Sequence, residues 1–261
     1  MKSFFYTMAM ILPVFLLWFC TSSTNAINKN KMGKKDSTIK INTANKNIAV
    51  LELFTSQGCS SCPPADKLLG TYAAKENVIP LSFHVDYWDR LGWKDPFSSK
   101  DYSERQYMYA SALKSEVYTP QLIINGQQEM IGSDANKIGA ALQKVSSETP
   151  DAMLSVKKAE ANNGKVNISF YLSGDINNSL LNIALLENKI TTPIKAGENG
   201  GATLTDYNVV LDFATIKKFN EGENNLSIDI PVSLAPGNRT LALYLQQKDS
   251  HKISAADKLE F

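Results

Sequence analysis

The chain has 261 residues, of which 43% are hydrophobic and 20% are charged, and its formal net charge is +1. This length allows two domains, and the composition is that of an ordinary globular protein rather than of a disordered or fibrous one. A net charge so close to zero gives no reason to expect nucleic acid as a partner.

Residues 1–26 have the pattern of a secretory signal peptide. Lys2 precedes an apolar run over residues 8–19, and small residues then lead to a cleavage position after Ala26. The run is shorter than the roughly 20 apolar residues that a membrane span needs, so we expect no transmembrane span once the signal is removed. Cys20 offers a lipid anchor as an alternative, but bulky residues precede it. We expect export to the periplasm or beyond.

The next segments predict an α/β domain over residues 48–149. Residues 27–47 are rich in Lys and Asn without periodicity, which indicates a flexible leader. Beyond it, the pattern predicts strands at 48–54 and 78–85, helices that begin near Cys59 and at Lys100, an aromatic and acidic loop at 86–99, a hairpin after Pro120, and a helix over 133–145. Such alternation is typical of helices packed over a sheet.

The remaining residues, 150–261, predict a second domain that is rich in β-strands. Short alternating runs such as KVNISFYLSG, LLNIALLEN and TLALYLQQ are separated by clusters of turn residues. Strands at this spacing favour an antiparallel sandwich. Residues 197–201 (GENGG) lack the strand-to-helix context of a phosphate-binding loop, so we interpret them as a β-turn region. This domain shows no catalytic constellation, which favours a binding or scaffold role.

Cys59 and Cys62 are the only cysteines left after cleavage at Ala26, and they form one Cys-X-X-Cys pair at the start of a predicted helix. The exposed N–H groups and the dipole of such a helix favour a thiolate at Cys59. Cys62, one turn later, would attack the resulting mixed disulfide. The pair thus predicts exchange with protein or small-molecule thiols and disulfides, with a redox-active Cys59–Cys62 disulfide and no other cofactor.

The order of these features resembles the thioredoxin fold, in which the pair follows the first strand and a proline precedes the third. The resemblance implies that the Thr119–Pro120 peptide bond is cis and that both residues lie beside the cysteines, where substrate binds. A narrower resemblance is to the bacterial secreted family catalogued as domain of unknown function 1223. It is carried by the strings LELFTSQGCSSCPPAD, FHVDYWDRLGWKDPFS, ERQYMY, YTPQLIING, IGSD and ENKITTPIKAGENGGATLTDYNVV. It implies a thioredoxin-like first domain without an established role.

Glu52 lies on the strand that leads to the cysteines, one residue out of register with the buried acid of thioredoxins. In a buried position it would have a raised pKa and would accept the proton of Cys62. Glu52 on the exposed side of an alternating strand is an equally good interpretation.

Two further groups of residues have alternative interpretations. His84, near Asp86 and Asp89, would complete a copper or zinc site with Cys59 and Cys62, although a solvent-facing loop in which His84 bonds to an aspartate is the simpler interpretation. Three aromatic residues of the following loop would either form an apolar lip for a partner peptide or pack the loop onto the domain. These residues are Tyr87, Trp88 and Trp93.

The leading hypothesis is therefore a thiol–disulfide oxidoreductase of the envelope. The alternatives are a copper-handling module that uses the same thiolates and a binding protein whose Cys59–Cys62 bond is a closed structural disulfide.

Overall fold

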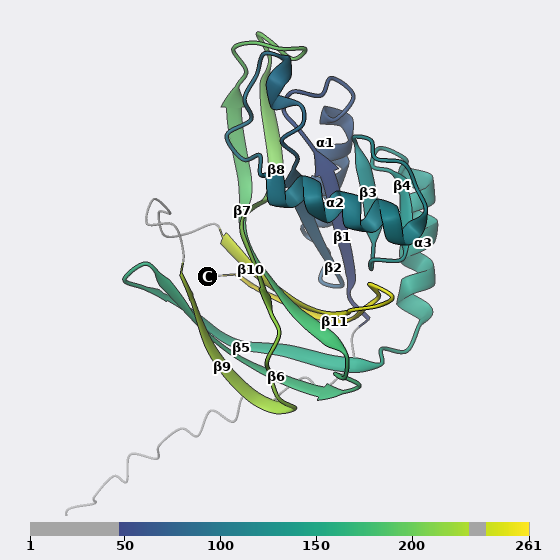
Figure 1. The fold of residues 1–261 in the computed structure, drawn as a ribbon, viewed down its shortest axis with the longest axis vertical. Helices are drawn as coiled ribbons and strands as arrows, with labels where there is room; N and C mark the ends of the chain where they lie inside the picture. The colour runs from purple at the N-terminus through teal and green to yellow at the C-terminus, as the bar shows by residue number, and fades with distance from the viewer. Residues whose placement is uncertain (1–46, 230–238, 261) are drawn as a thin grey trace, which may run out of the picture. The chain divides into compact units, whose positions relative to one another are not determined.

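The structure, a computed structural model, describes residues 47–229 and 239–260 (Figure 1). The expected signal peptide, Cys20 and nearly all of the expected leader lie outside these residues. Within the described ranges, no helix is both long enough and apolar enough to cross a bilayer.

The first half of the described chain alternates strands and helices, as the sequence predicts. Two prolines occupy the first turn of α1, where backbone N–H groups lack helical partners, and Ser99 and Asp134 cap α2 and α3 through their side chains. The elements are β1 (Ala49–Thr55), α1 (Pro63–Tyr72), β2 (Val78–His84), the 3-10 helix η1 (Asp89–Leu91), α2 (Lys100–Leu113), β3 (Gln121–Ile124), β4 (Gln128–Ile131) and α3 (Ala135–Ser147).

The second half of the described chain consists of strands, also as predicted, but they do not build a separate β-sandwich. Four of them extend the sheet of the first half, whose strand order is β11-β10-β7-β8-β2-β1-β3-β4. The junction is a parallel pairing of Ser82 in β2 with Val209 in β8. The strands are β5 (Ala152–Asn162), β6 (Lys165–Gly174), β7 (Ser179–Pro193), β8 (Thr203–Ile216), β9 (Gly222–Asp229), β10 (Arg239–Gln247) and β11 (Ile253–Glu260).

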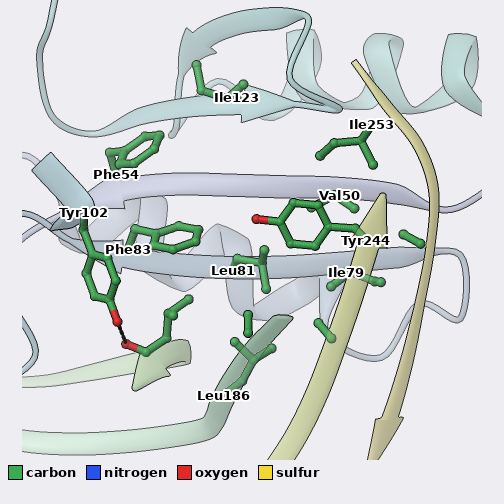
Figure 2. Packing of buried hydrophobic residues seen from close by; sticks show 14 of the residues in the cluster. Val50, Phe54, Ile79, Leu81, Phe83, Tyr102, Ile123, Leu186, Tyr244 and Ile253 are labelled. Atoms are coloured by element: carbon green, nitrogen blue, oxygen red, sulfur yellow. Dashed lines mark hydrogen bonds between the residues drawn. The ribbon is translucent and has the colours of Figure 1, made fainter. Parts of the chain in front are cut away.

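Helices cover both faces of the sheet around β1. Side chains that alternate along a strand point to opposite faces, and Leu51 and Leu53 accordingly pack with α1 and α3. Val50 and Phe54 face the other way and pack with Tyr102 and Tyr109 of α2. Figure 2 shows this second core, in which residues of β7 and β10 join those of β1 and β2. One apolar core therefore spans both halves of the sequence.

The small sheet β5-β6-β9 packs on the far part of the large sheet. In β7, Leu181 and Ile183 face the small sheet, whereas Ala184 and Leu186 face the α2 side. The central residues of β7 and β10 are consequently buried on both faces. The expected sandwich exists only as this local layer, formed by three strands against a sheet that both halves share.

Two contacts from the second half position α1. The ring of Tyr207 in β8 lies against Gly70, where an added Cβ would come within 2.7 Å of ring carbons. At the end of α1, the Nζ of Lys258 in β11 donates to the carbonyl oxygens of Ala73, Lys75 and Val78 at 2.9–3.2 Å. Distant strands thereby fix the helix that follows the cysteines.

The contact at Gly70 predicts opposite effects for two helical glycines. Gly70→Ala is expected to lower the free energy of unfolding by about 1–3 kcal/mol, because the methyl group meets the Tyr207 ring. Gly139→Ala in α3 is the matched control: an added Cβ there meets nothing within 4 Å, so we expect a gain of up to about 1 kcal/mol from helix propensity. Urea unfolding measures both, and equal gains would mean that the Tyr207 ring turns aside.

Candidate functional site

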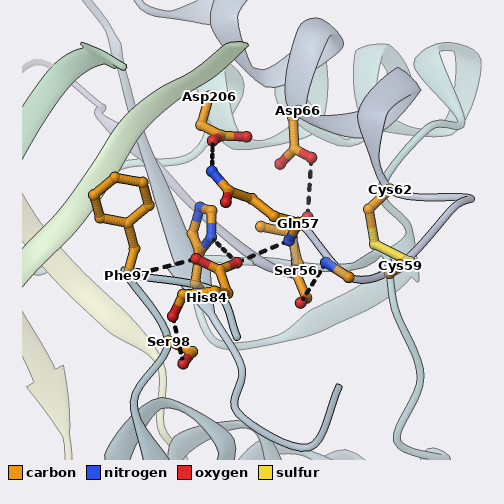
Figure 3. A network of polar contacts seen from close by, with 12 residues as sticks. Ser56, Gln57, Cys59, Cys62, Asp66, His84, Phe97, Ser98 and Asp206 are labelled. Atoms are coloured by element: carbon orange, nitrogen blue, oxygen red, sulfur yellow. Dashed lines mark hydrogen bonds and ion pairs between the residues drawn. A yellow bond between two sulfur atoms is a disulfide. The ribbon is translucent and has the colours of Figure 1, made fainter. Parts of the chain in front are cut away.

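Cys59 and Cys62 form a disulfide at the start of α1 (Figure 3), with their Cα atoms 5.5 Å apart. Cys62 is the N-terminal cap residue of α1, and its carbonyl oxygen accepts the N–H groups of Ala65 and Asp66 at 2.8 and 3.1 Å. Both cysteines are 0% exposed, although Ser60 and Ser61 between them are exposed. The pair therefore lies just beneath the surface rather than on it.

Thr119 and Pro120 lie beside this disulfide. The peptide bond between them is cis, as the thioredoxin resemblance implies. The Thr119 carbonyl oxygen is 4.0 Å from the Cys59 Sγ atom and accepts a hydrogen bond from the Ser61 hydroxyl at 3.4 Å. The fold thus brings Thr119 and Pro120, two of the expected site residues, to the cysteines.

In the 86–99 loop, Tyr87, Trp88 and Trp93 are half-buried, and each of these side chains makes a hydrogen bond. Trp88 donates to the Thr119 hydroxyl at 2.9 Å, and Trp93 donates to the Gln57 side-chain carbonyl at 3.1 Å. Tyr87 instead donates to Gln106 on α2 at 3.2 Å. The two tryptophans therefore border the Cys-X-X-Cys segment, and Tyr87 ties the loop to α2.

Glu52 is buried, but it does not face the cysteines. Its carboxylate accepts two hydrogen bonds from the Arg105 guanidinium, at 2.7 and 2.9 Å, and one from the Tyr109 hydroxyl at 3.0 Å. All of these lie on the α2 side of the sheet, whereas its strand neighbours Leu51 and Leu53 face α1. The structure thus contradicts an exposed position for Glu52, whose side chain is 0% exposed, and places its carboxylate on the face of β1 opposite to α1.

His84 bonds to a residue that the sequence analysis did not name. Its Nδ1 lies 2.7 Å from an Asp95 carboxylate oxygen, and both side chains are buried. Asp86 accepts instead from Ser103, and Asp89 accepts from the Asp95 N–H and the Ser98 hydroxyl. The described residues hold no group of three or more His, Cys, Asp or Glu side chains suited to a metal ion.

A buried polar network surrounds Gln57, two residues before Cys59 (Figure 3). The Gln57 backbone N–H donates to Asp95 at 2.8 Å, and its side-chain amide donates to Asp206 of β8 at 2.6 Å. Close by, the Thr55 hydroxyl donates to Asp66 of α1 at 3.0 Å. The Asp66 Oδ1 and His84 Nε2 atoms are buried without a hydrogen-bond partner. Three buried carboxyl groups and one imidazole therefore gather behind the disulfide.

Burial and mutual charge shift the pKa values of these groups. Burial raises the pKa of Asp66 to about 7, an effect that the nearby His84 reduces, and burial also raises the pKa of Asp206. For His84, burial lowers the pKa, but the Asp95 carboxylate outweighs it, and the result is a raised pKa of about 9. Burial of Asp95 acts to raise its pKa, but the charge and hydrogen bond of His84 give a net lowering. At neutral pH the network thus contains an ionised His84–Asp95 pair, beside an Asp66 whose pKa is raised toward neutral pH.

The loop between β7 and β8, residues 194–202, lies directly on the Cys-X-X-Cys segment. The Asn199 side-chain amide donates to the carbonyl oxygens of Gln57 and Cys59, at 2.9 and 3.0 Å. The Glu198 carboxylate accepts the Ser60 N–H at 3.1 Å. The sequence of residues 197–201 predicts only a turn, because no local pattern predicts a contact across about 140 residues of chain.

Comparison with solved structures finds a crystal structure of a protein from Agrobacterium tumefaciens that is 32% identical, with a TM-score of 0.61, over 81% of this chain and 93% of that one. A domain of the outer membrane lipoprotein Omp28 from Porphyromonas gingivalis aligns over 42% of this chain and 95% of that one, at 11% identity. Its TM-score of 0.27 is too low to support any argument. No curated protein matches.

The family comparison agrees with the similarity to the Agrobacterium tumefaciens protein. The matching family is described as "Protein of unknown function (DUF1223)", and its match covers residues 50–246. The match includes the cysteine pair, the 86–99 loop and the β7–β8 loop. The chain therefore belongs to the DUF1223 family.

Proposed function

We propose that the protein exchanges thiols and disulfides through Cys59 and Cys62, in a thioredoxin-like unit formed by the β2-β1-β3-β4 part of the sheet and its three helices. The observation that carries the proposal is the disulfide at the start of α1 with the cis Thr119–Pro120 bond beside it. Unpaired N–H groups at a helix start favour a thiolate at the first cysteine. A persistent disulfide also fits the expected export, because exported compartments are oxidising.

In the proposed exchange, the Cys59 thiolate attacks a disulfide of the partner. The partner's S–S bond breaks, a mixed disulfide forms, and one partner thiol leaves. Cys62 then loses its proton and attacks the Cys59 sulfur. This step restores the Cys59–Cys62 bond and releases the second partner thiol, so the partner gains two electrons. The reverse sequence oxidises a partner dithiol.

Asp66 is the group that we propose for the Cys62 proton, in place of Glu52. It lies four residues after Cys62, and residues at this spacing share a helix face. Its pKa of about 7 suits a proton acceptor near neutral pH. Its Oδ1 atom is buried without a hydrogen-bond partner, which leaves one carboxylate oxygen available for the proton.

The complete burial of both cysteines favours a second candidate, a binding protein with a structural disulfide. The two candidates differ in the reduction potential of the pair. Known exchange proteins lie between about −270 and −120 mV, whereas structural disulfides typically lie below about −300 mV.

The deciding experiment equilibrates the purified mature protein in glutathione or dithiothreitol buffers and measures the reduced fraction of the pair. A potential within the exchange window supports the oxidoreductase, and a potential below about −300 mV supports the structural disulfide. A copper(I) titration of the reduced protein tests the metal-handling alternative, which requires one tightly bound ion for each chain. A His84 ligand to that ion would have to be the Nε2 atom after loss of its proton, since Nδ1 is bonded to Asp95.

A further inference from the structure

The β7–β8 loop satisfies the backbone groups that flank the disulfide. Asn199 bonds to the carbonyl oxygens of Gln57 and Cys59, and Glu198 bonds to the Ser60 N–H. Two of these groups belong to the Cys-X-X-Cys segment, the Gln57 carbonyl lies two residues before it, and a partner that docks there must reach the same surface. The loop thus occupies the place of a docked partner.

The loop also closes against the aromatic side of the site. A Cβ added at Gly197 would lie 3.1 Å from the Trp93 Cβ atom, so loop and tryptophan are in contact. On the opposite side, Trp88 packs on Gly58, where an added Cβ would lie 3.2 Å from the Trp88 Cβ atom. Between these contacts the exposed fraction of both cysteines is 0%. The Cys59 sulfur is therefore buried while the loop is seated, and it lies 3.3 Å from the Ser61 hydroxyl and 4.0 Å from the Thr119 carbonyl oxygen.

Glu198 adds a charge to this cover. The hydrogen bond from Ser60 lowers the pKa of its carboxyl group, so Glu198 is ionised at neutral pH. A negative charge near Cys59 opposes the formation of a second negative charge, the thiolate, on that cysteine. The seated loop therefore acts beside Cys59 in two ways: its side chains bond to the backbone around that cysteine, and Glu198 places a negative charge there.

From these contacts we propose that the β7–β8 loop is a gate over Cys59–Cys62, that the Asn199 amide is its latch, and that an extended segment of a partner protein displaces it. This inference rests on the proposed function. When the loop leaves, two carbonyl acceptors and one N–H donor lose their partners, and unmade hydrogen bonds are costly. An extended polypeptide presents N–H and C=O groups in alternation and can satisfy both kinds. After displacement, a partner thiolate attacks the Cys59 sulfur, the Cys59–Cys62 bond breaks, and Cys62 leaves as a thiolate that takes up a proton.

The first test compares the rates at which dithiothreitol reduces the oxidised full-length mature protein and its loop variants. Asn199→Ala removes two hydrogen bonds that hold the loop in place, and we expect reduction about tenfold faster or more. Glu198→Gln retains an acceptor but removes the charge, and we expect a smaller acceleration. Lys195→Ala is the matched control, because Lys195 is an exposed residue of the same loop; its rate should equal that of the wild type. Circular dichroism verifies that each variant is folded.

The second test identifies the occupant. The probe is a ten-residue peptide with one central cysteine, compared with the same peptide carrying proline on both sides of that cysteine. Proline lacks the backbone N–H that would replace the Asn199 amide, so the proline peptide should reduce the wild-type disulfide several-fold more slowly. Equal rates for the two peptides would overturn the assignment of an extended polypeptide as the occupant.

The outcomes separate the gate from the proposed function. Equal rates for wild type and Asn199→Ala, with a reduction potential in the exchange window, overturn the gate alone. Faster reduction of Asn199→Ala with a potential below the exchange window supports the gate and overturns the oxidoreductase. A disulfide that resists dithiothreitol in all variants overturns both.

Discussion

Glu52→Gln is expected to lower the free energy of unfolding by about 3–5 kcal/mol, because it leaves the Arg105 charge buried without its counter-ion. The Arg105 side chain is only 10% exposed, and that of Glu52 is 0% exposed. The guanidinium also donates to the hydroxyls of Tyr109 and Tyr244 and to the Gln246 side chain, at 3.0–3.1 Å. The ion pair therefore joins β1, α2 and β10, and urea unfolding at neutral pH measures its loss.

A double variant is the control for this prediction. Replacing the pair by apolar residues, in Glu52→Leu with Arg105→Met, should recover a large part of the lost stability, since no unpaired charge remains. We also expect folded Glu52→Gln to keep the wild-type pH dependence of thiol exchange, because Glu52 lies on the face of β1 opposite to α1. A shifted pH profile would contradict this assignment and restore Glu52 as the acceptor of the Cys62 proton.

Asp66→Asn is expected to stabilise the oxidised protein at pH 8, by an amount on the order of a few kcal/mol. Burial raises the pKa of Asp66 from its ordinary value of 3.8 to about 7, so the folded state binds this proton more tightly than the unfolded state does. Stability therefore falls as the pH rises from about 4 to about 7, and the full cost of a buried carboxylate remains above pH 7. Asparagine has no such charge to bury.

The pH dependence of unfolding tests this assignment. The slope of stability between pH 4 and pH 7 should become flatter in Asp66→Asn, whereas the exposed Asp101→Asn in α2 should keep the wild-type slope. His84 causes a second decline in the free energy of unfolding at higher pH. Its raised pKa of about 9 contributes stability that is complete below its ordinary pKa of 6.5 and is lost as the pH rises through 9. If Asp66→Asn is less stable than the wild type at pH 8, the hydrogen bond that Asp66 accepts from Thr55 contributes more stability than burial of the Asp66 charge costs.

The local elements could be predicted because their signals are local. Apolar runs marked β1 and β2, and the two prolines after Cys62 marked the first turn of α1. The sharing of one sheet by both halves was missed, because strand pairing depends on residues far apart in the chain. The runs LLNIALL in β7 and TLALYLQ in β10 did carry a signal: strands apolar at successive positions are buried on both faces, unlike the outer strands of a free-standing sandwich.

The site could be predicted only in part, again because local patterns reveal some of its residues and not the contacts between distant segments. The motifs predict the disulfide partners and Pro120. Glu52 lies one residue away from the position that would face the cysteines, and a shift of one residue moves a side chain to the opposite face of a strand. Asp66 was detectable, since it shares a helix face with Leu69, which is buried. Asp95, Asp206 and Asn199 reach the site from separate segments, and nothing in their own neighbourhoods reveals that they meet Gln57.

The assembly of the cysteine surroundings from distant segments has a consequence for the growing chain. Synthesis proceeds from the N-terminus, so Cys59 and Cys62 emerge about 140 residues before Asn199. During that interval Asn199 and Tyr207 have not yet been synthesised, so their contacts with the Cys-X-X-Cys segment and with α1 are absent. The order of synthesis thus makes the two cysteines available to each other before the β7–β8 loop can bond to the backbone around them.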